Sequence, residues 1–134
     1  SFCKSLKTLK GAPKEVGNSF DCSNCEELIS LNGAPEIVKG NFYCSFCKSL
    51  KTLKGAPKEV GNHFECFNCN SLKTLKGAPE IVKGRFDCSY CKSLKTLKGA
   101  PKEVEDRFFC DNCGKLFTTN DVEKVSKVKG NIYC

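Results

Sequence analysis

Tryptophan and methionine are absent from the 134-residue sequence, and histidine occurs once. Without methionine, Ser1 is not an initiator residue, and because residues 1–18 are identical to residues 45–62, the chain opens inside a repeat. We therefore expect a processed or trimmed piece, or a chain whose earlier repeats are missing. No apolar run approaches the ~20 residues that a membrane-spanning helix needs, so we expect no membrane insertion.

The usual motifs of catalytic sites are also missing. The sequence has no glycine-rich phosphate loop and no pair of carboxylates at a fixed site. The only histidine, His63, alternates with Phe64 and Cys66, so it faces outward and is poorly placed to act as a base for the inward cysteine. A catalytic site would interrupt the repeat at one place, and the only interruption is in the last repeat. The sequence predicts no enzyme and no cofactor.

The feature that is present throughout is a repeat of 22 residues. Gly-Ala-Pro recurs at this spacing at 11–13, 33–35, 55–57, 77–79 and 99–101. A unit this short cannot bury its apolar face alone, so neighbouring units must stack. We predict one solenoid domain over residues 1–134. Its repeats are about 1–18 (partial), 19–40, 41–62, 63–84, 85–106 and 107–134, the last with a C-terminal cap.

Each repeat has the same order of local signals. Phe-x-Cys alternates, which predicts one short parallel strand with both side chains on one face. Two leucines spaced by three residues suit a tight 3₁₀ turn on an otherwise irregular convex side, and Gly-Ala-Pro then breaks the direction. The predicted structural core is Phe20, Cys22, Cys25, Phe42, Cys44, Cys47, Phe64, Cys66, Cys69, Phe86, Cys88, Cys91, Phe108, Cys110 and Cys113.

The last repeat departs from this pattern after Cys113. Gly-Ala-Pro is lost and two residues are added. Asn120, with Glu123 three residues later, is a helix-start signature, and valines at 122, 125 and 128 give a spaced apolar stripe. We predict a short helix that caps the open end of the core.

The pattern Val-x-x-x-Phe-x-Cys-x-x-Cys-x-x-Leu-x-x-Leu resembles the leucine-rich repeat in its cysteine-containing form. The resemblance covers residues 1–116, although Val16 and Phe20 are one residue further apart than in the family pattern. The Gly-Ala-Pro-Lys-Glu-Val-Gly segment is most similar to arrays in bacteria and their phages. The resemblance implies a concave parallel sheet that binds other macromolecules. It also implies that the Cys25 position of each repeat turns toward backbone groups of the loop.

Cysteine is abundant, with 12 residues in the chain. They form C-x-x-C pairs at 22/25, 44/47, 66/69, 88/91 and 110/113, with Cys3 and Cys134 as halves of further pairs. Reduced thiols packed as small apolar side chains are the favoured interpretation, which predicts a cytoplasmic protein and no metal. Disulfides between stacked repeats would be geometrically allowed and would predict an extracellular protein. Paired C-x-x-C motifs also have the spacing of a four-cysteine zinc site.

Lysines recur in columns, in a chain with a net charge of +7. Lys10, Lys54, Lys76 and Lys98 share one position, and Lys7, Lys51, Lys73 and Lys95 share another. These columns are either a basic stripe for nucleic acid or another polyanion, or a solvated face that resists edge-to-edge association. We favour the solvated face, because no aromatic residues interleave with the lysines to stack on bases.

The outward positions of the predicted strand vary while their neighbours stay fixed. Aromatic residues and arginine at variable positions on one face are typical of a recognition surface. We therefore predict a protein–protein interaction module that binds a protein partner, with nucleic acid or a purely structural array as alternatives. Nothing in the sequence indicates the oligomeric state. The predicted binding residues are Tyr43, Phe46, His63, Glu65, Phe67, Arg85, Asp87, Tyr90, Arg107 and Phe109.

Overall fold

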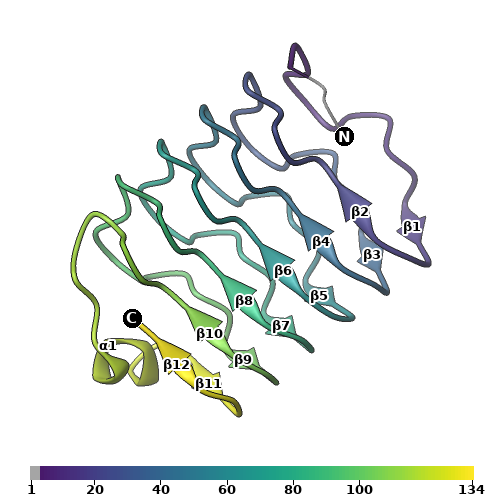
Figure 1. The fold of residues 1–134 in the computed structure, drawn as a ribbon. Coiled ribbons are helices and arrows are strands. Elements are labelled where there is room, and N and C mark those ends of the chain that lie inside the picture. Colours follow the sequence, from purple (N-terminus) through teal and green to yellow (C-terminus); the bar gives the residue numbers. More distant parts are fainter. Residues whose placement is uncertain (1–3) are drawn as a thin grey trace.

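The chain folds as a parallel β-solenoid of about five turns with a 22-residue period, in a computed structural model that describes residues 4–134. Cys3 therefore lies outside the described residues. The coils follow one another in a nearly straight row (Figure 1). Two parallel six-stranded sheets run along the stack, and every strand has two residues.

We name the sheets by their buried residue. The valine sheet contains β1 (Glu15–Val16), β3 (Ile37–Val38), β5 (Glu59–Val60), β7 (Ile81–Val82), β9 (Glu103–Val104) and β11 (Lys127–Val128). The phenylalanine sheet contains β2 (Phe20–Asp21), β4 (Phe42–Tyr43), β6 (Phe64–Glu65), β8 (Phe86–Asp87), β10 (Phe108–Phe109) and β12 (Ile132–Tyr133).

The prediction of one strand per repeat was wrong, because the valine segment also pairs between coils. Val38 of β3 lies opposite Val60 of β5, in the same register that places Phe42 opposite Phe64. A two-residue strand is too short to produce a visible alternation in sequence, so only the longer Phe-x-Cys pattern was recognisable. The expected 3₁₀ turn exists only as isolated bonds, such as the one that Leu50 N–H donates to the Cys47 carbonyl over 3.2 Å.

Backbone hydrogen bonds between coils hold the stack in register. In the coil of β4, the amides of Phe42, Cys44 and Phe46 donate to carbonyl oxygens of the next coil over 2.8, 2.8 and 3.0 Å. Alternate residues donate to the same neighbouring coil, as in any parallel sheet. The 22-residue period therefore brings equivalent residues to the same place in every coil.

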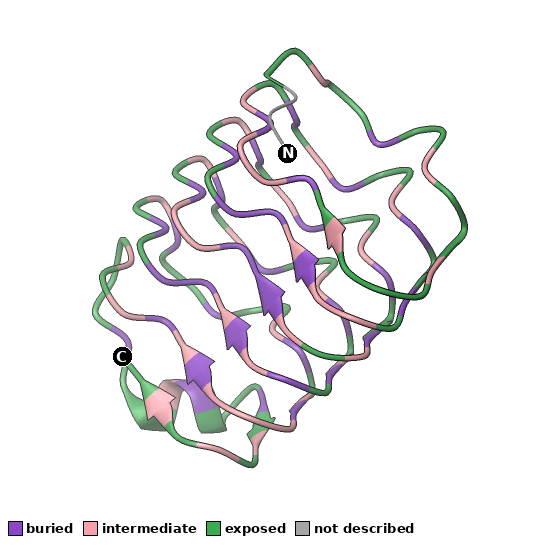
Figure 2. Ribbon diagram, turned by 45° about the vertical axis from the view of Figure 1, so that its right-hand side comes forward, coloured by how far each residue is buried: buried purple, intermediate pink, exposed green. Residues whose placement is uncertain are grey.

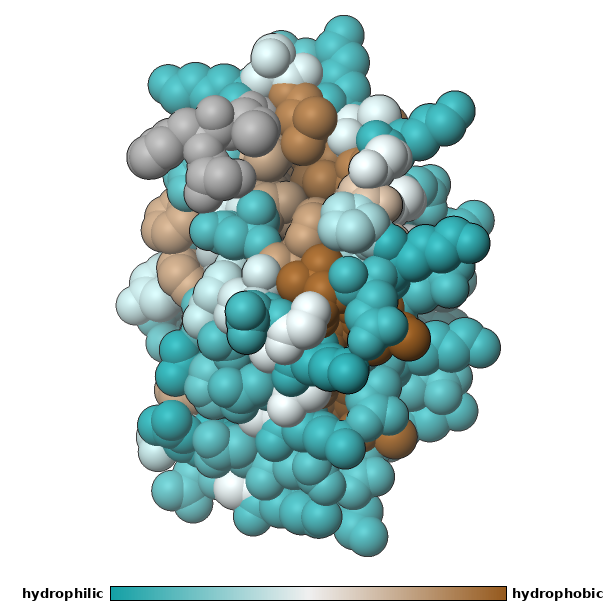
Figure 3. All heavy atoms as spheres, turned by 90° about the vertical axis from the view of Figure 1, so that its right-hand side faces the viewer, coloured by the Kyte–Doolittle hydropathy of each residue, from teal (hydrophilic) through white to brown (hydrophobic). Residues whose placement is uncertain are grey.

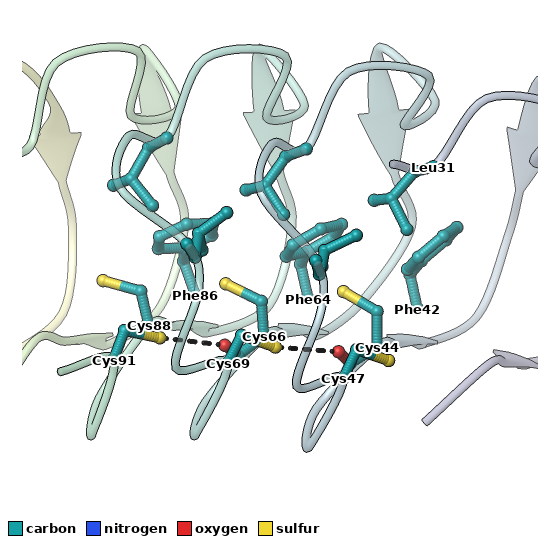
Figure 4. Packing of buried hydrophobic residues seen from close by; sticks show 14 of the residues in the cluster. Leu31, Phe42, Cys44, Cys47, Phe64, Cys66, Cys69, Phe86, Cys88 and Cys91 are labelled. Atoms are coloured by element: carbon teal, nitrogen blue, oxygen red, sulfur yellow. Dashed lines mark hydrogen bonds between the residues drawn. The ribbon is translucent and has the colours of Figure 1, made fainter. Parts of the chain in front are cut away.

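The core between the sheets consists of columns of identical side chains. In the middle coils the phenylalanines stack, with ring centroids 5.2 Å apart for Phe42 and Phe64 and 5.6 Å for Phe64 and Phe86. Figure 4 shows these rings beside the leucine and cysteine columns. Of the predicted core residues, all but Phe20 and Cys113 are buried, and these two are half-buried near opposite ends of the stack. The buried segments recur in successive coils (Figure 2).

Lys-Glu-Val-Gly-Asn at 14–18 and 58–62 alternates with Glu-Ile-Val-Lys-Gly at 36–40 and 80–84, which gives the sequence a second period of 44 residues. This longer period has a structural basis in the valine sheet. Lys39 Nζ lies 3.2 Å from a Glu15 carboxylate oxygen, and Lys83 Nζ lies 3.1 Å from one of Glu59. Each pair joins a Lys-Glu-Val-Gly-Asn coil to the Glu-Ile-Val-Lys-Gly coil after it. Exposed pairs of this kind contribute little stability each. They do place a lysine of one coil beside a glutamate of the coil before it, so that like charges are not stacked directly on one another.

The single helix in the described residues is α1 (Thr119–Glu123). It starts two residues earlier than predicted, because Thr118 and not Asn120 is the N-cap. Thr118 Oγ1 accepts from the Asp121 amide over 3.2 Å, and Asp121 accepts from the Thr118 amide over 2.9 Å. This reciprocal pair is a capping box, with Asp in place of the usual Glu. Val122 of α1 is fully buried, as predicted for the apolar stripe, whereas Val125 is exposed.

Two glycines in identical Lys-Glu-Val-Gly-Asn segments provide a test of the stacking. A Cβ added at Gly61 would collide with the carbonyl oxygen of Lys39 in the preceding coil, whereas at Gly17 no atom of the described residues lies within 4 Å. We expect Gly61→Ala to lower the free energy of unfolding by about 2 kcal/mol, because the backbone must shift. Gly17→Ala should change it by less than about 1 kcal/mol. Urea denaturation followed by circular dichroism measures both, and equal effects would contradict the close approach of the coils.

Candidate functional site

The ten predicted binding residues lie together along the outer side of the phenylalanine sheet. Four neighbouring strands of this sheet, β4, β6, β8 and β10, each contribute one outward residue: Tyr43, Glu65, Asp87 and Phe109. The three basic residues immediately precede strands, and the remaining aromatic residues lie in the C-x-x-C turns that follow. The structure therefore brings the whole set to one surface, which we call the variable face.

The turns of the variable face hold aromatic residues in an unfavourable backbone conformation. The third residue of each C-x-x-C turn has a positive φ, between 55° and 60° in five successive coils. Three of these residues are asparagines, which tolerate the left-handed region, but Phe46 and Tyr90 are bulky. Their side chains are 41% and 47% exposed. More than a third of each side chain therefore remains open to solvent at a position whose backbone conformation disfavours a bulky residue.

Among residues 4–134, aromatic rings contact one another across coils at two places on this face. Phe46 and Phe67 meet edge to face with centroids 5.2 Å apart, and Phe109 stacks on Tyr133 at 4.7 Å. Tyr133 was missed by sequence reasoning, because the two residues added in the last repeat move it out of the 22-residue column. The register of Phe109 opposite Tyr133 in β10 and β12 restores the alignment.

Acidic side chains gather at the C-terminal half of the variable face. Ser89 Oγ donates to an Asp111 carboxylate oxygen over 2.6 Å, and the Ser89 amide donates to Asp87 over 2.9 Å. Burial raises the pKa of Asp87, and the nearby carboxylates of Glu65 and Asp111 add to this effect. Glu65, 8% exposed, instead pairs with the guanidinium of Arg85. Ser89 and Asp111 were not among the predicted site residues, although their columns were recognised as variable.

One coil pair earlier, the equivalent serine has no partner. Ser45 Oγ is buried and makes no hydrogen bond among the described residues. In the repeat, Ser45 corresponds to Ser89, and Phe67 occupies the position of Asp111. The phenylalanine therefore replaces the acceptor that would satisfy the hydroxyl. An aromatic residue on the surface is present here at the expense of a buried hydrogen bond.

In three successive coils, the residue before the strand of the phenylalanine sheet accepts a hydrogen bond from a backbone amide of the next coil. The Asn41 amide donates to Ser19 Oγ over 3.2 Å, the His63 amide to Asn41 Oδ1 over 3.0 Å, and the Arg85 amide to His63 Nδ1 over 3.0 Å. His63 faces outward, as predicted, and this contact requires an unprotonated Nδ1. Its role in the stack is thus to accept a backbone hydrogen bond.

The cysteines form two buried ladders. The second cysteine of a pair donates its S–H to the carbonyl of the first cysteine in the preceding coil, over 3.3 Å for Cys47 to Cys22 and 3.2 Å for Cys69 to Cys44. Figure 4 marks two of these bonds. Burial raises the pKa of the Cys91 thiol to about 12. The eleven described cysteines are free thiols, and residues 4–134 contain no group of three or more His, Cys, Asp or Glu side chains arranged to hold a metal.

The lysine columns lie outside the variable face. Among the described residues, the six lysines that flank the leucine turns in the middle repeats form no ion pair, unlike those of the valine sheet. They are Lys51, Lys54, Lys73, Lys76, Lys95 and Lys98. Figure 3 views the molecule from the right-hand side of Figure 1, where hydrophilic side chains cover most of the surface and apolar ones show in separate patches.

Compared with protein-family models, with curated proteins and with solved structures, the chain has no match. Within the part of the chain that the structure describes, no helix has the length and apolar character needed to cross a membrane.

Ser45 and Ser89 allow the same substitution to be compared at one position of the repeat. Ser89→Ala removes a hydrogen bond to a carboxylate and should lower the free energy of unfolding by about 1–2 kcal/mol. Ser45→Ala removes a buried hydroxyl that has no partner and should be neutral or stabilising by up to about 1 kcal/mol. Urea unfolding of both variants measures the difference; a larger loss for Ser45→Ala would show that its hydroxyl is satisfied.

His63 predicts a dependence of stability on pH. Burial, with a smaller effect of Arg85, lowers the pKa of His63 from 6.5. As the pH falls, the unfolded chain therefore binds a proton at His63 more readily than the folded chain does. The contribution of His63 to the free energy of unfolding is complete above pH 6.5 and is lost as the pH falls below it. The matched variant is His63→Asn, because Asn41 performs the same role. Urea midpoints of the wild type should fall relative to the variant between pH 6.5 and 5; parallel profiles would contradict the contact.

Proposed function

We propose that this chain is a non-enzymatic protein–protein interaction module that presents the variable face to a protein partner. The observation that carries the proposal is that aromatic side chains lie on this face at positions where they lower the stability of the fold. Phe46 and Tyr90 occupy left-handed positions while 41% and 47% exposed, and Phe67 leaves a buried serine hydroxyl unsatisfied. Residues held in unfavourable local conformations are typical of binding sites.

The fixed core beside a variable surface gives further support. The phenylalanine, cysteine and leucine columns hold every coil in the same geometry, so substitutions on the outer positions change the surface without changing the scaffold. Aromatic residues and arginine are enriched in interface hot spots, and both occur on this face. Ring pairs such as Phe109 and Tyr133 already place apolar area on this face, with the Arg107 guanidinium carbon 5.7 Å from the centre of Phe109.

The relation to leucine-rich repeats and the role of α1 are parts of the same proposal. The S–H donation by the second cysteine to loop backbone supports the cysteine-containing form of that repeat, as found in bacteria and phages. The burial of Val122 and Phe117 supports α1 as a cap over the core. Free, buried thiols support a cytoplasmic location.

A second candidate is a polyanion or nucleic-acid binder. The six lysines without ion pairs beside the leucine turns favour it, because they leave positive charge uncompensated on one side of a chain with net charge +7. Binding through these lysines would weaken steeply with salt, since it releases counterions. Binding through the variable face would depend far less on salt.

The test is a variant in which Tyr43, Phe67 and Phe109 are all replaced by serine. Partners captured by the immobilised wild-type chain are identified, purified and titrated by calorimetry. We expect the triple variant to lose at least tenfold in affinity for a specific partner, because its apolar anchors are gone. The matched control replaces Lys51, Lys73 and Lys95 by serine and should retain binding. Circular dichroism checks that both variants keep the fold.

Retention of every partner by the triple variant would contradict the proposal. Loss of binding in the lysine variant alone, with a steep dependence on salt, would instead support the polyanion binder.

A further inference from the structure

A small pocket on the variable face combines aromatic and acidic side chains. It has a volume of about 260 Å³ and is lined by Phe67, Asp87, Ser89, Tyr90, Phe109 and Asp111. Pockets that bury drug-sized ligands begin at roughly 300 Å³, so this one suits a single side chain. Its walls come from three successive coils, so the stacking of the solenoid fixes their relative positions.

The two carboxylates of the pocket have no cation of their own. Neither Asp87 nor Asp111 takes part in an ion pair among residues 4–134, whereas the neighbouring Glu65 is paired with Arg85. The chain supplies only neutral donors: the Ser89 amide to Asp87, and the Ser89 hydroxyl and the Asn112 side-chain amide to Asp111. Two negative charges are thus held close together, and the raised pKa of Asp87 is consistent with this.

The rings of the pocket are of the type that attracts cations. Lys92 Nζ lies 5.8 Å from the centre of the Tyr90 ring, and the Arg107 guanidinium carbon lies 5.7 Å from the centre of Phe109. Both are within the range of a cation–π contact. An arginine side chain combines the features that this pocket would select. Its planar guanidinium stacks on aromatic rings, is weakly hydrated and donates in several directions to carboxylates.

We infer that the pocket between Tyr90 and Phe109 binds an arginine side chain of the protein partner. This inference rests on the proposed function and names the chemistry of the partner, a segment with an exposed arginine. Asp87 and Asp111 accept the guanidinium hydrogen bonds, and Tyr90 and Phe67 pack against its planar face and its alkyl stem. Phe109, which already stacks on Tyr133, closes one side of the pocket.

The equivalent place two coils earlier acts as an internal comparison. There, Tyr43, Phe46 and Phe67 retain the aromatic character, but the only carboxylate is Glu65, which is already paired with Arg85. That site therefore has aromatic rings without free negative charge. An arginine should prefer the pocket that contains Asp87 and Asp111.

The experiment titrates the ¹⁵N-labelled full chain with three acetylated and amidated tripeptides: Gly-Arg-Gly, Gly-citrulline-Gly and Gly-Lys-Gly. Citrulline has nearly the shape of arginine but carries no charge. We expect saturable shifts of the Ser89, Tyr90 and Asp111 amide signals with the arginine peptide, with a dissociation constant in the millimolar range. The citrulline peptide should bind at least tenfold more weakly, and the lysine peptide several-fold more weakly.

Two variants and a control complete the design. Asp87→Asn and Asp111→Asn each keep a side-chain oxygen that can accept from Ser89, and each should weaken the arginine peptide at least tenfold. Glu80→Gln removes one exposed carboxylate outside the pocket and should leave the affinity unchanged. Shifts that are non-saturable or spread over the surface, or an equal effect of Glu80→Gln, would overturn the inference. Equal binding of the lysine peptide would overturn the assignment to guanidinium.

The peptide titration is independent of partner capture, so the two proposals can fail separately. If the triple serine variant loses its partner but the arginine peptide does not bind the pocket, the proposed function stands and this inference fails. If the peptide binds the pocket but capture does not depend on the variable face, the proposed function fails, and with it the assignment of the site to a partner's arginine.

Discussion

Backbone hydrogen bonding between coils, repeated every 22 residues, is the constraint on which the rest of the structure depends. Strands of two residues cannot form a stable sheet alone, and each becomes ordered only because the coils on either side offer donors and acceptors in register. The same register aligns like side chains into columns. Phenylalanines then stack, cysteine S–H groups reach the preceding coil's carbonyls, and glycine is required where Gly61 approaches Lys39. The core is therefore a consequence of the period.

That constraint also explains how a surface can vary. A side chain pointing outward from the phenylalanine sheet contacts outward side chains of the neighbouring coils, so a substitution affects these neighbours and leaves the scaffold intact. Such a substitution can lower stability, as Ser45 illustrates. Phe67 occupies the position that Asp111 has two coils later, so the Ser45 hydroxyl has no acceptor. Phe46 and Tyr90 show a second cost, a bulky side chain at positive φ. Both costs support the proposal that the variable face binds a partner.

Much of the architecture could be predicted from the sequence because identical residues recur at a fixed spacing. The Phe-x-Cys alternation identified the inward columns, and the loss of Gly-Ala-Pro identified the different last repeat. The second strand could not be predicted, since Val16 and its equivalents have no second inward residue two positions away, as each phenylalanine has in the following cysteine. The ten site residues were recognised as variable positions, but the pocket needs contacts between coils: Ser89 with Asp111, and Tyr133 with Phe109. Such contacts depend on the directions of the side chains, which an alignment of the repeats does not show.

The coils of residues 4–134 stack around a core that contains free thiols, without a metal site or a disulfide bridge. Counting thiols and zinc tests this most directly. Native protein should contain no zinc and should react slowly at the nine buried cysteines, because a reagent reaches them only when the coils open. After denaturation without reductant, all 12 cysteines of the chain should react. One zinc for every two C-x-x-C pairs would contradict the coil stack itself, and far fewer than 12 reactive thiols after denaturation would replace the free-thiol core with a disulfide-bonded one.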